Sequence, residues 1–130
     1  MTHLSVAKFG GTSVANFEAM SACANIITAD QNTKVVVLSA SAGVTNYLVE
    51  LANGCDAERR EEILTAVRTI QYNIIEKLQN PQAVSAEIDA LLEHVAALAE
   101  SASLATSLAL TDELICHGEM MSTKIFTQLL

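Results

Sequence analysis

The chain has 130 residues, 51% of them hydrophobic, which is enough for one folded domain with a core and excludes a disordered chain. Its formal net charge of −8 argues against a nucleic-acid or anionic-membrane partner, because no cluster of lysine and arginine interrupts the acidic surface. No apolar run approaches the roughly 18 residues that cross a bilayer, so the sequence predicts a soluble, cytoplasmic protein.

The first forty residues alternate between extended and helical patterns. A short apolar run covers residues 4–9, and the sequence KVVVLSAS at 34–41 contains four consecutive apolar residues, as in a strand buried on both faces. Between them, apolar residues recur every three or four positions from 14 to 27, which predicts a helix. Strand, helix and strand in this order predict a crossover unit with two parallel strands.

The remainder of the chain is predicted to be almost wholly helical. A short helix at about 44–54 ends near a glycine, and a longer periodic run over 63–78 stops before a proline. A third helix is predicted at 84–98, and the alanine- and serine-rich residues 96–107 are expected to follow it as a tail or bend.

A final helix is predicted from near Thr111, and its apolar residues still lie on one face at the end of the chain. No Gly, Asn or Pro closes this run. Two parallel strands alone cannot bury both faces of a sheet, since parallel sheets normally have more strands with helices on each side. We therefore expect residues 1–130 to be the N-terminal piece of a larger α/β domain.

Cysteine and histidine usage gives no sign of a disulfide framework or a metal site. The cysteines are odd in number, lack a C-x-x-C spacing and are expected to be reduced, small buried hydrophobic residues: Cys23, Cys55 and Cys116. The histidines also lack a metal-ligand spacing: His3, His94 and His117. The latter two lie in predicted helices, where we expect structural or surface roles.

The sequence KFGGTSV, at the end of the first predicted strand, combines Lys8 with the glycine pair Gly10 and Gly11. Glycine amides can approach an oxyanion closely, and a lysine together with a following helix N-terminus adds positive charge. The spacing fits neither a Walker A loop nor a dinucleotide-binding G-x-G-x-x-G. Taken alone, the stretch indicates either a phosphate-binding turn or an ordinary strand–helix connection.

Three motifs occur in order: KFGGTSV at 8–14, LSASAGVTN at 38–46 and LTDELICHGEMMST at 110–123. Together they resemble the N-terminal signatures of aspartate kinases, most closely the bacterial lysine-sensitive class, and the resemblance covers essentially the whole chain. It implies the three-layer α/β/α amino acid kinase fold, with parallel strands first and a largely helical second half. The nucleotide-binding half and the regulatory ACT domains of that family would then lie outside residues 1–130.

The resemblance also implies an activity. Aspartate kinases transfer the γ-phosphoryl of ATP, bound as its Mg²⁺ complex, to the side-chain carboxylate of L-aspartate, giving 4-phospho-L-aspartate for lysine, threonine and methionine biosynthesis. Lys8 matches the catalytic lysine at the transferred phosphoryl, and Gly10 and Gly11 match its backbone donors. The positions that match aspartate-binding residues are Ser39, Thr45 and Glu119.

Thr45 and Glu119 each have a simpler interpretation. Thr45 lies at a predicted helix start, where threonine is a common N-cap. Glu119 shares a helix face with Asp112 and Ser122, and such polar faces are usually solvated. The neighbouring Gly118 favours function, because a glycine in mid-helix commonly marks a close approach by a ligand or backbone.

Two other functional classes remain open at this stage. One is another amino acid kinase, such as a glutamate or uridylate kinase, and the other is a non-catalytic module that only binds a ligand or partner. We expect no kinase turnover from residues 1–130 alone. The complete protein is expected to be a lysine-regulated homo-oligomer without a tightly bound cofactor or structural metal.

Overall fold

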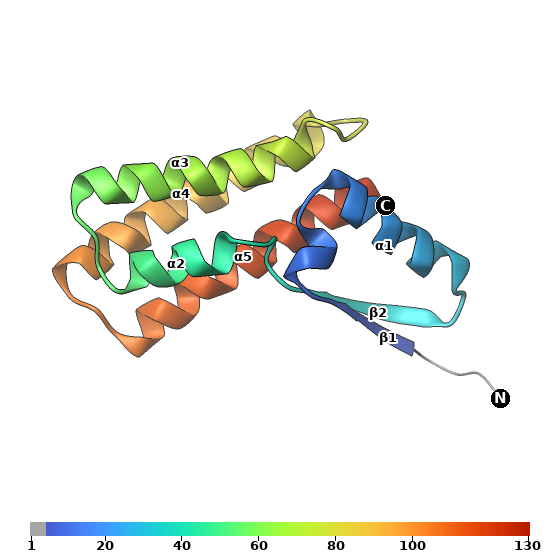
Figure 1. The fold of residues 1–130 in the computed structure, drawn as a ribbon, viewed down its shortest axis with the longest axis horizontal. Helices are drawn as coiled ribbons and strands as arrows, with labels where there is room; N and C mark the ends of the chain where they lie inside the picture. Colours follow the sequence, from blue (N-terminus) through green and yellow to red (C-terminus); the bar gives the residue numbers. More distant parts are fainter. Residues whose placement is uncertain (1–4) are drawn as a thin grey trace.

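The computed structural model describes residues 5–130, so the expected strand residue Leu4 and His3 lie outside the described range. Figure 1 shows the order of the elements, with the strands and α1 at one end and a group of longer helices at the other. The elements are β1 (Ser5–Phe9), the 3₁₀-helix η1 (Gly11–Val14), α1 (Phe17–Ala29), β2 (Thr33–Leu38), α2 (Val44–Ala52), α3 (Ala57–Ile75), α4 (Gln82–Leu104) and α5 (Leu108–Leu129).

The two strands form a parallel pair, which confirms the predicted strand–helix–strand unit. Lys8 stands opposite Val37 in this pair, and Phe9 stands opposite Leu38. Because residues opposite each other in the register point to the same face, Lys8 and Val37 share one face while Phe9 and Leu38 share the other. The carboxyl ends of both strands therefore meet at the same edge of the sheet.

The two faces of the sheet differ in burial. Phe9, Val36 and Leu38 pack with the hydrophobic core, whereas Val35 and Val37 are 51% and 44% exposed. Within the described residues, β2 is therefore buried on one face only, as expected where two parallel strands stand alone. An uninterrupted run of valines makes both faces apolar, but the described helices cover only one of them.

Capping side chains mark the starts of α1 and α5, and both starts differ from the prediction. The Asn16 side chain accepts the Ala19 amide at 2.8 Å, so α1 begins at Phe17 and Val14 lies in η1 instead. The Ser107 hydroxyl accepts the Leu110 amide at 3.1 Å, so α5 begins one turn before Thr111.

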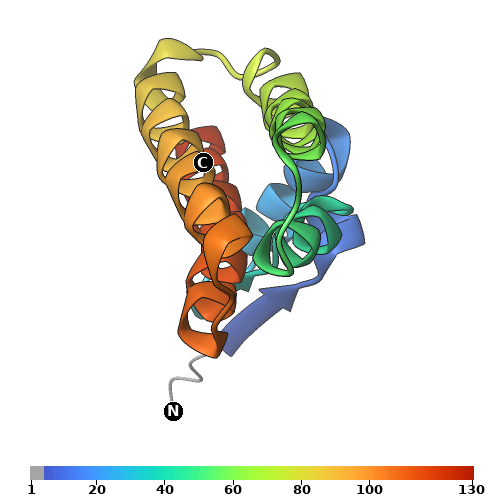
Figure 2. The same cartoon turned by 90° about the vertical axis from the view of Figure 1, so that its left-hand side faces the viewer.

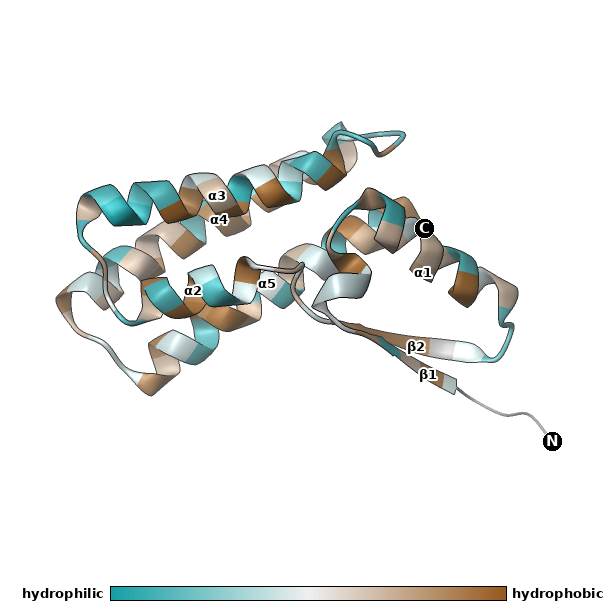
Figure 3. Cartoon of the chain, in the orientation of Figure 1, coloured by the Kyte–Doolittle hydropathy of each residue, from teal (hydrophilic) through white to brown (hydrophobic). Residues whose placement is uncertain are grey.

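The predicted tail at 96–107 is mostly helix, since α4 continues to Leu104. Val95, Ala99 and Ala102 are all buried along this stretch. Helix α4 lies beside α5, as Figure 2 shows. Figure 3 shows the long helices alternating between hydrophilic and hydrophobic residues, as amphipathic helices do.

The burial of Cys116 and of Ser122 differs from the prediction. Cys23 is buried, which raises the pKa of its thiol, whereas Cys116 is exposed and the prediction that it is buried is wrong. Ser122 is fully buried, so it does not extend the polar face of Glu119. Among residues 5–130, no helix is both long and apolar enough to cross a membrane.

Candidate functional site

The loops that follow β1 and β2 are joined to each other by backbone hydrogen bonds. The Ser39 amide donates to the Phe9 carbonyl at 3.1 Å, and the Ala42 amide donates to the Gly11 carbonyl at 3.1 Å. A β-carbon at Gly11 would lie 3.1 Å from the Ala40 carbonyl oxygen. Glycine at position 11 thus suits this close approach of the two loops, since a β-carbon there would press on the Ala40 carbonyl.

An open hollow of about 420 Å³ lies where these two loops meet the start of α2. Three of the predicted site residues line it: Gly11, Ser39 and Thr45. The structure adds polar lining residues that the sequence did not single out: Thr12, Ser41 and Asn46. All three lie inside the quoted motifs, so the motifs located them, although no pattern distinguished them from their neighbours.

The start of α2 provides hydrogen-bond donors to this hollow. Its N-cap residue is Gly43, which has a positive φ of 89° and no side chain to accept the first-turn amides. The Val44 amide donates to Ser41, and the Tyr47 amide donates to Gly43. The amides of Thr45 and Asn46, between them, belong to the positive end of the helix and suit a carboxylate or phosphoryl oxygen. Thr45 itself follows the N-cap, so the N-cap alternative for this residue is wrong.

Glu119 lines a neighbouring hollow of about 450 Å³ between α5 and β2, together with Leu38, Cys116 and Lys124. Its side chain is exposed. Leu38 and Ser39 are consecutive, so the two hollows adjoin at the end of β2. The structure therefore places Glu119 beside the hollow that contains Ser39 and Thr45, but not within it.

Gly118 determines how closely α5 approaches this region. A β-carbon there would lie 2.9 Å from the Ala40 β-carbon and 3.0 Å from Leu48 Cδ1. The close approach expected at this glycine is therefore made by protein side chains from the second loop and α2. The effect is to fix α5, and with it the backbone of Glu119, against the loop that carries Ser39.

Lys8 and Gly10 line neither hollow in the described structure. The Lys8 side chain is exposed, and within residues 5–130 it has no carboxylate partner in an ion pair. A β-carbon at Gly10 would meet no heavy atom within 4 Å. Packing of the described residues thus explains the glycine at position 11 but not the one at position 10.

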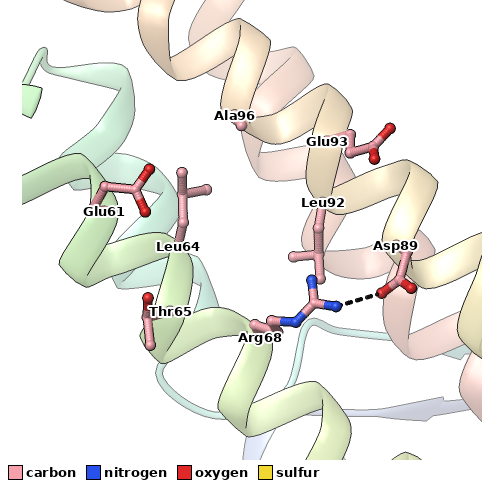
Figure 4. A pocket seen from close by; sticks show the side chains of 8 residues that line it. All are labelled: Glu61, Leu64, Thr65, Arg68, Asp89, Leu92, Glu93 and Ala96. Atoms are coloured by element: carbon pink, nitrogen blue, oxygen red, sulfur yellow. Dashed lines mark hydrogen bonds and ion pairs between the residues drawn. The ribbon is translucent and has the colours of Figure 1, made fainter.

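A further hollow, of about 330 Å³, lies between α3 and α4 and contains none of the predicted site residues (Figure 4). The Arg68 guanidinium, which lines this hollow, pairs with Asp89 at 3.0 Å and lies 4.9 Å from the centre of the Tyr72 ring. Burial raises the pKa of Tyr72, and so does the hydrogen bond that its hydroxyl donates to Asp89. These polar groups satisfy one another, as expected for a structural helix–helix junction.

The two helical histidines form a contact between α4 and α5. His117 Nδ1 lies 2.7 Å from the Glu113 carbonyl oxygen and therefore donates to it, and His117 Nε2 lies 2.9 Å from His94 Nδ1, from which the neutral His117 ring accepts. His117 is buried, so the expected structural role fits the geometry. Among residues 5–130, no group of three or more His, Cys, Asp or Glu side chains is arranged to bind a metal ion.

Comparison with known proteins agrees with this arrangement. Residues 3–130 match the family model described as the amino acid kinase family. The chain belongs to the amino acid kinase family. This amino acid kinase chain is 54% identical over its whole length to the lysine-sensitive aspartokinase 3 of Escherichia coli, of which it spans 29%. The resemblance to aspartate kinases inferred from the three motifs is confirmed.

Solved structures show the same fold. Two crystal structures of E. coli aspartokinase III match with a TM-score of 0.96 and 54% identity, covering 98% of this kinase chain and 28% of theirs. One of them contains lysine and aspartate, and the other contains aspartate and ADP. The expected α/β amino acid kinase fold, with a parallel pair and a mostly helical remainder, is confirmed.

A second relative has a name that describes it as inactive. A Haemophilus influenzae protein is 70% identical over 64 residues, 49% of this kinase chain and 53% of that protein, and its name includes the words inactive aspartokinase 3. Similarity within this family is therefore not sufficient evidence for turnover.

Proposed function

We propose that residues 1–130 form the N-terminal part of the catalytic domain of an aspartate kinase, which phosphorylates the side-chain carboxylate of L-aspartate with ATP, supplied as its Mg²⁺ complex. The observation that supports it most strongly is the convergence of the first two motifs on one hollow at the carboxyl edge of the sheet, with the third beside it. Ligands of α/β folds bind at this edge. The E. coli relative of known structure contains aspartate and ADP.

In this proposal, one set of residues binds aspartate and another set contacts the transferred phosphoryl group. Ser39, Thr45 and the free amides at the start of α2 bind the aspartate, whose negative charge the helix N-terminus stabilises. Glu119, beside them, pairs with the α-amino group and so selects an amino acid over a plain dicarboxylate.

Lys8, Gly10 and Gly11 act at the phosphoryl end. The Lys8 ammonium neutralises charge that builds on the transferred phosphoryl, and the glycine amides donate to its oxygens. No side-chain base is needed, because the attacking carboxylate is already ionised at neutral pH. Catalysis by these residues consists of alignment and charge neutralisation.

The complete protein is, in this proposal, a cytoplasmic homo-oligomer that feeds lysine, threonine and methionine biosynthesis and responds to lysine. The support for lysine regulation is the name of the E. coli relative and its structure with lysine bound. Nucleotide-base contacts and the regulatory domains are assigned to parts of the protein outside residues 1–130.

A second candidate, a non-catalytic binding module, has the support of the relative named as inactive. One experiment separates the two. Residues 1–130 are joined to the remainder of E. coli aspartokinase III, and aspartyl phosphate formed with Mg²⁺, ATP and aspartate is trapped by hydroxylamine. The proposal expects hydroxamate from this chimera and none from residues 1–130 alone, whereas a folded but inactive chimera favours the binding module.

A further inference from the structure

One side chain joins the loop after β1 to the loop after β2. The Ser41 hydroxyl donates to the Val14 carbonyl at 2.7 Å, across 27 positions of sequence, and both residues are at least 99% buried. The other two links between these loops, from Ser39 to Phe9 and from Ala42 to Gly11, use backbone atoms only. Any sequence with this fold makes the backbone links, but the third depends on a hydroxyl at position 41.

The Val14 carbonyl has no other hydrogen-bond donor outside η1 among the described residues. Val14 is the last residue of η1, where the chain turns from the glycine pair toward α1. Replacing Ser41 by alanine thus leaves a buried acceptor unpaired and releases the end of η1 from the second loop. The backbone hydrogen bond from Ala42 to Gly11 is then no longer supported by the adjacent hydrogen bond from Ser41 to Val14.

The position of this hydrogen bond relative to the candidate site gives it a consequence beyond stability. Gly11, which the proposed function assigns to the phosphoryl end, lines the same hollow as Ser39 and Thr45, which it assigns to the aspartate end. In-line transfer requires the two ends at a fixed separation, and an error of about 1 Å costs on the order of 100-fold in rate. We propose that Ser41 is a positioning residue for phosphoryl transfer, holding the phosphoryl loop and the aspartate loop in register through the Val14 carbonyl. This inference rests on the function proposed above.

The chain contains a matched control. Ser122 is fully buried like Ser41, but its hydroxyl has no hydrogen-bond partner within the described residues. Ser41→Ala and Ser122→Ala remove the same atom from the interior, and only the first removes a link between the loops. Ser41→Thr retains the hydroxyl.

The first measurement uses the chimera with E. coli aspartokinase III. Ser41→Ala is expected to lower kcat by on the order of 10-fold to 100-fold, with KM for aspartate within about threefold of the parent. Ser41→Thr recovers part of kcat, and Ser122→Ala stays close to the parent. A Ser41→Ala chimera with kcat within about twofold of the parent overturns the proposal.

The second measurement is independent of activity and uses residues 1–130 as they are. Amide hydrogen exchange by NMR is expected to show the Ala42 and Ser39 amides exchanging on the order of 10-fold faster in Ser41→Ala, with the amides of α3 unchanged. Unchanged exchange at Ala42 overturns the proposal. A parent chimera without activity contradicts the proposed function alone, and the exchange rates then decide whether Ser41 ties the loops.

Discussion

Gly118 packs against Ala40 so closely that a β-carbon at position 118 would lie only 2.9 Å from the β-carbon of Ala40. This contact joins the third motif to the second, since Gly118 precedes Glu119 and Ala40 follows Ser39. A side chain at position 118 would therefore push α5 away from the loop that carries Ser39.

Gly118→Ala is accordingly expected to destabilise the chain, because α5 must move away from Ala40 and Leu48. Overpacking of this kind costs about 1–3 kcal/mol, of which about 1 kcal/mol is regained from the higher helix propensity of alanine. Gly10→Ala is the matched control for stability, since a β-carbon there meets nothing within 4 Å and the backbone is extended. Urea unfolding measures both, and equal midpoints for the two variants would show that the contact is not tight.

Lys8→Ala in the chimera is expected to lower kcat by on the order of 100-fold or more, because a charge partner of the transition state is lost. The KM for aspartate should change little. Lys77→Ala is a suitable control, since Lys77 lies outside all three motifs and pairs with Glu18 on the surface. Steady-state kinetics with hydroxylamine trapping distinguishes them, and a near-normal kcat for Lys8→Ala would remove this lysine from the catalytic machinery.

Glu119→Gln is expected to act mainly on aspartate binding. The neutral amide cannot pair with the substrate's ammonium group, so KM for aspartate rises by on the order of 10-fold or more while kcat falls less. Asp112→Asn removes an exposed carboxylate two helical turns earlier and should leave KM unchanged. If the two variants have the same KM, Glu119 belongs to a solvated helix face and has no role in binding.

The ion pair between Glu50 on α2 and Arg59 on α3 predicts a dependence of stability on pH. The Arg59 guanidinium donates to both Glu50 oxygens and lowers the pKa of this carboxyl below its usual 4.5. Its stabilising effect is therefore complete above about pH 4.5 and is lost as the pH falls through the lowered pKa. The effect is small because both groups are partly exposed.

Glu50→Gln tests this sign directly. Its Tm should lie below that of the parent at pH 7, and the difference should shrink as the pH falls below about 4.5. Glu100→Gln, which removes an exposed carboxylate without an ion pair in the described structure, should show no such loss with pH. A constant difference between Glu50→Gln and the parent from pH 7 to pH 3 would contradict the assignment.

The sequence predicted the strand–helix–strand unit and the four following helices because each has a clear apolar period or a terminating glycine or proline. It did not predict the length of α4, because Ala99 and Ala102 carry too little apolar surface to distinguish a continuing helix from a tail or bend. It also gave no indication that Val35 and Val37 face outward, since a run of valines does not specify which face is covered.

The candidate site was predictable to the extent that it lies within contiguous motifs. Gly11, Ser39 and Thr45 were selected by resemblance, and the structure brings them to one hollow. The hydrogen bond from Ser41 to Val14 was not predictable, because it joins residues 27 positions apart and depends on tertiary packing. The same holds for the contact of Gly118, whose partners are on another helix and loop.

Substrate preference of the chimera tests the central claim most directly, because Ser39, Thr45 and Glu119 all come from residues 1–130. Hydroxylamine trapping with aspartate, glutamate and succinate, each with Mg²⁺ and ATP, compares the acceptors. The proposed site predicts steady hydroxamate formation with aspartate and rates at least on the order of 100-fold lower with the other two. A folded chimera that forms no aspartyl hydroxamate, or that prefers glutamate, would contradict the assignment of this chain to aspartate phosphorylation.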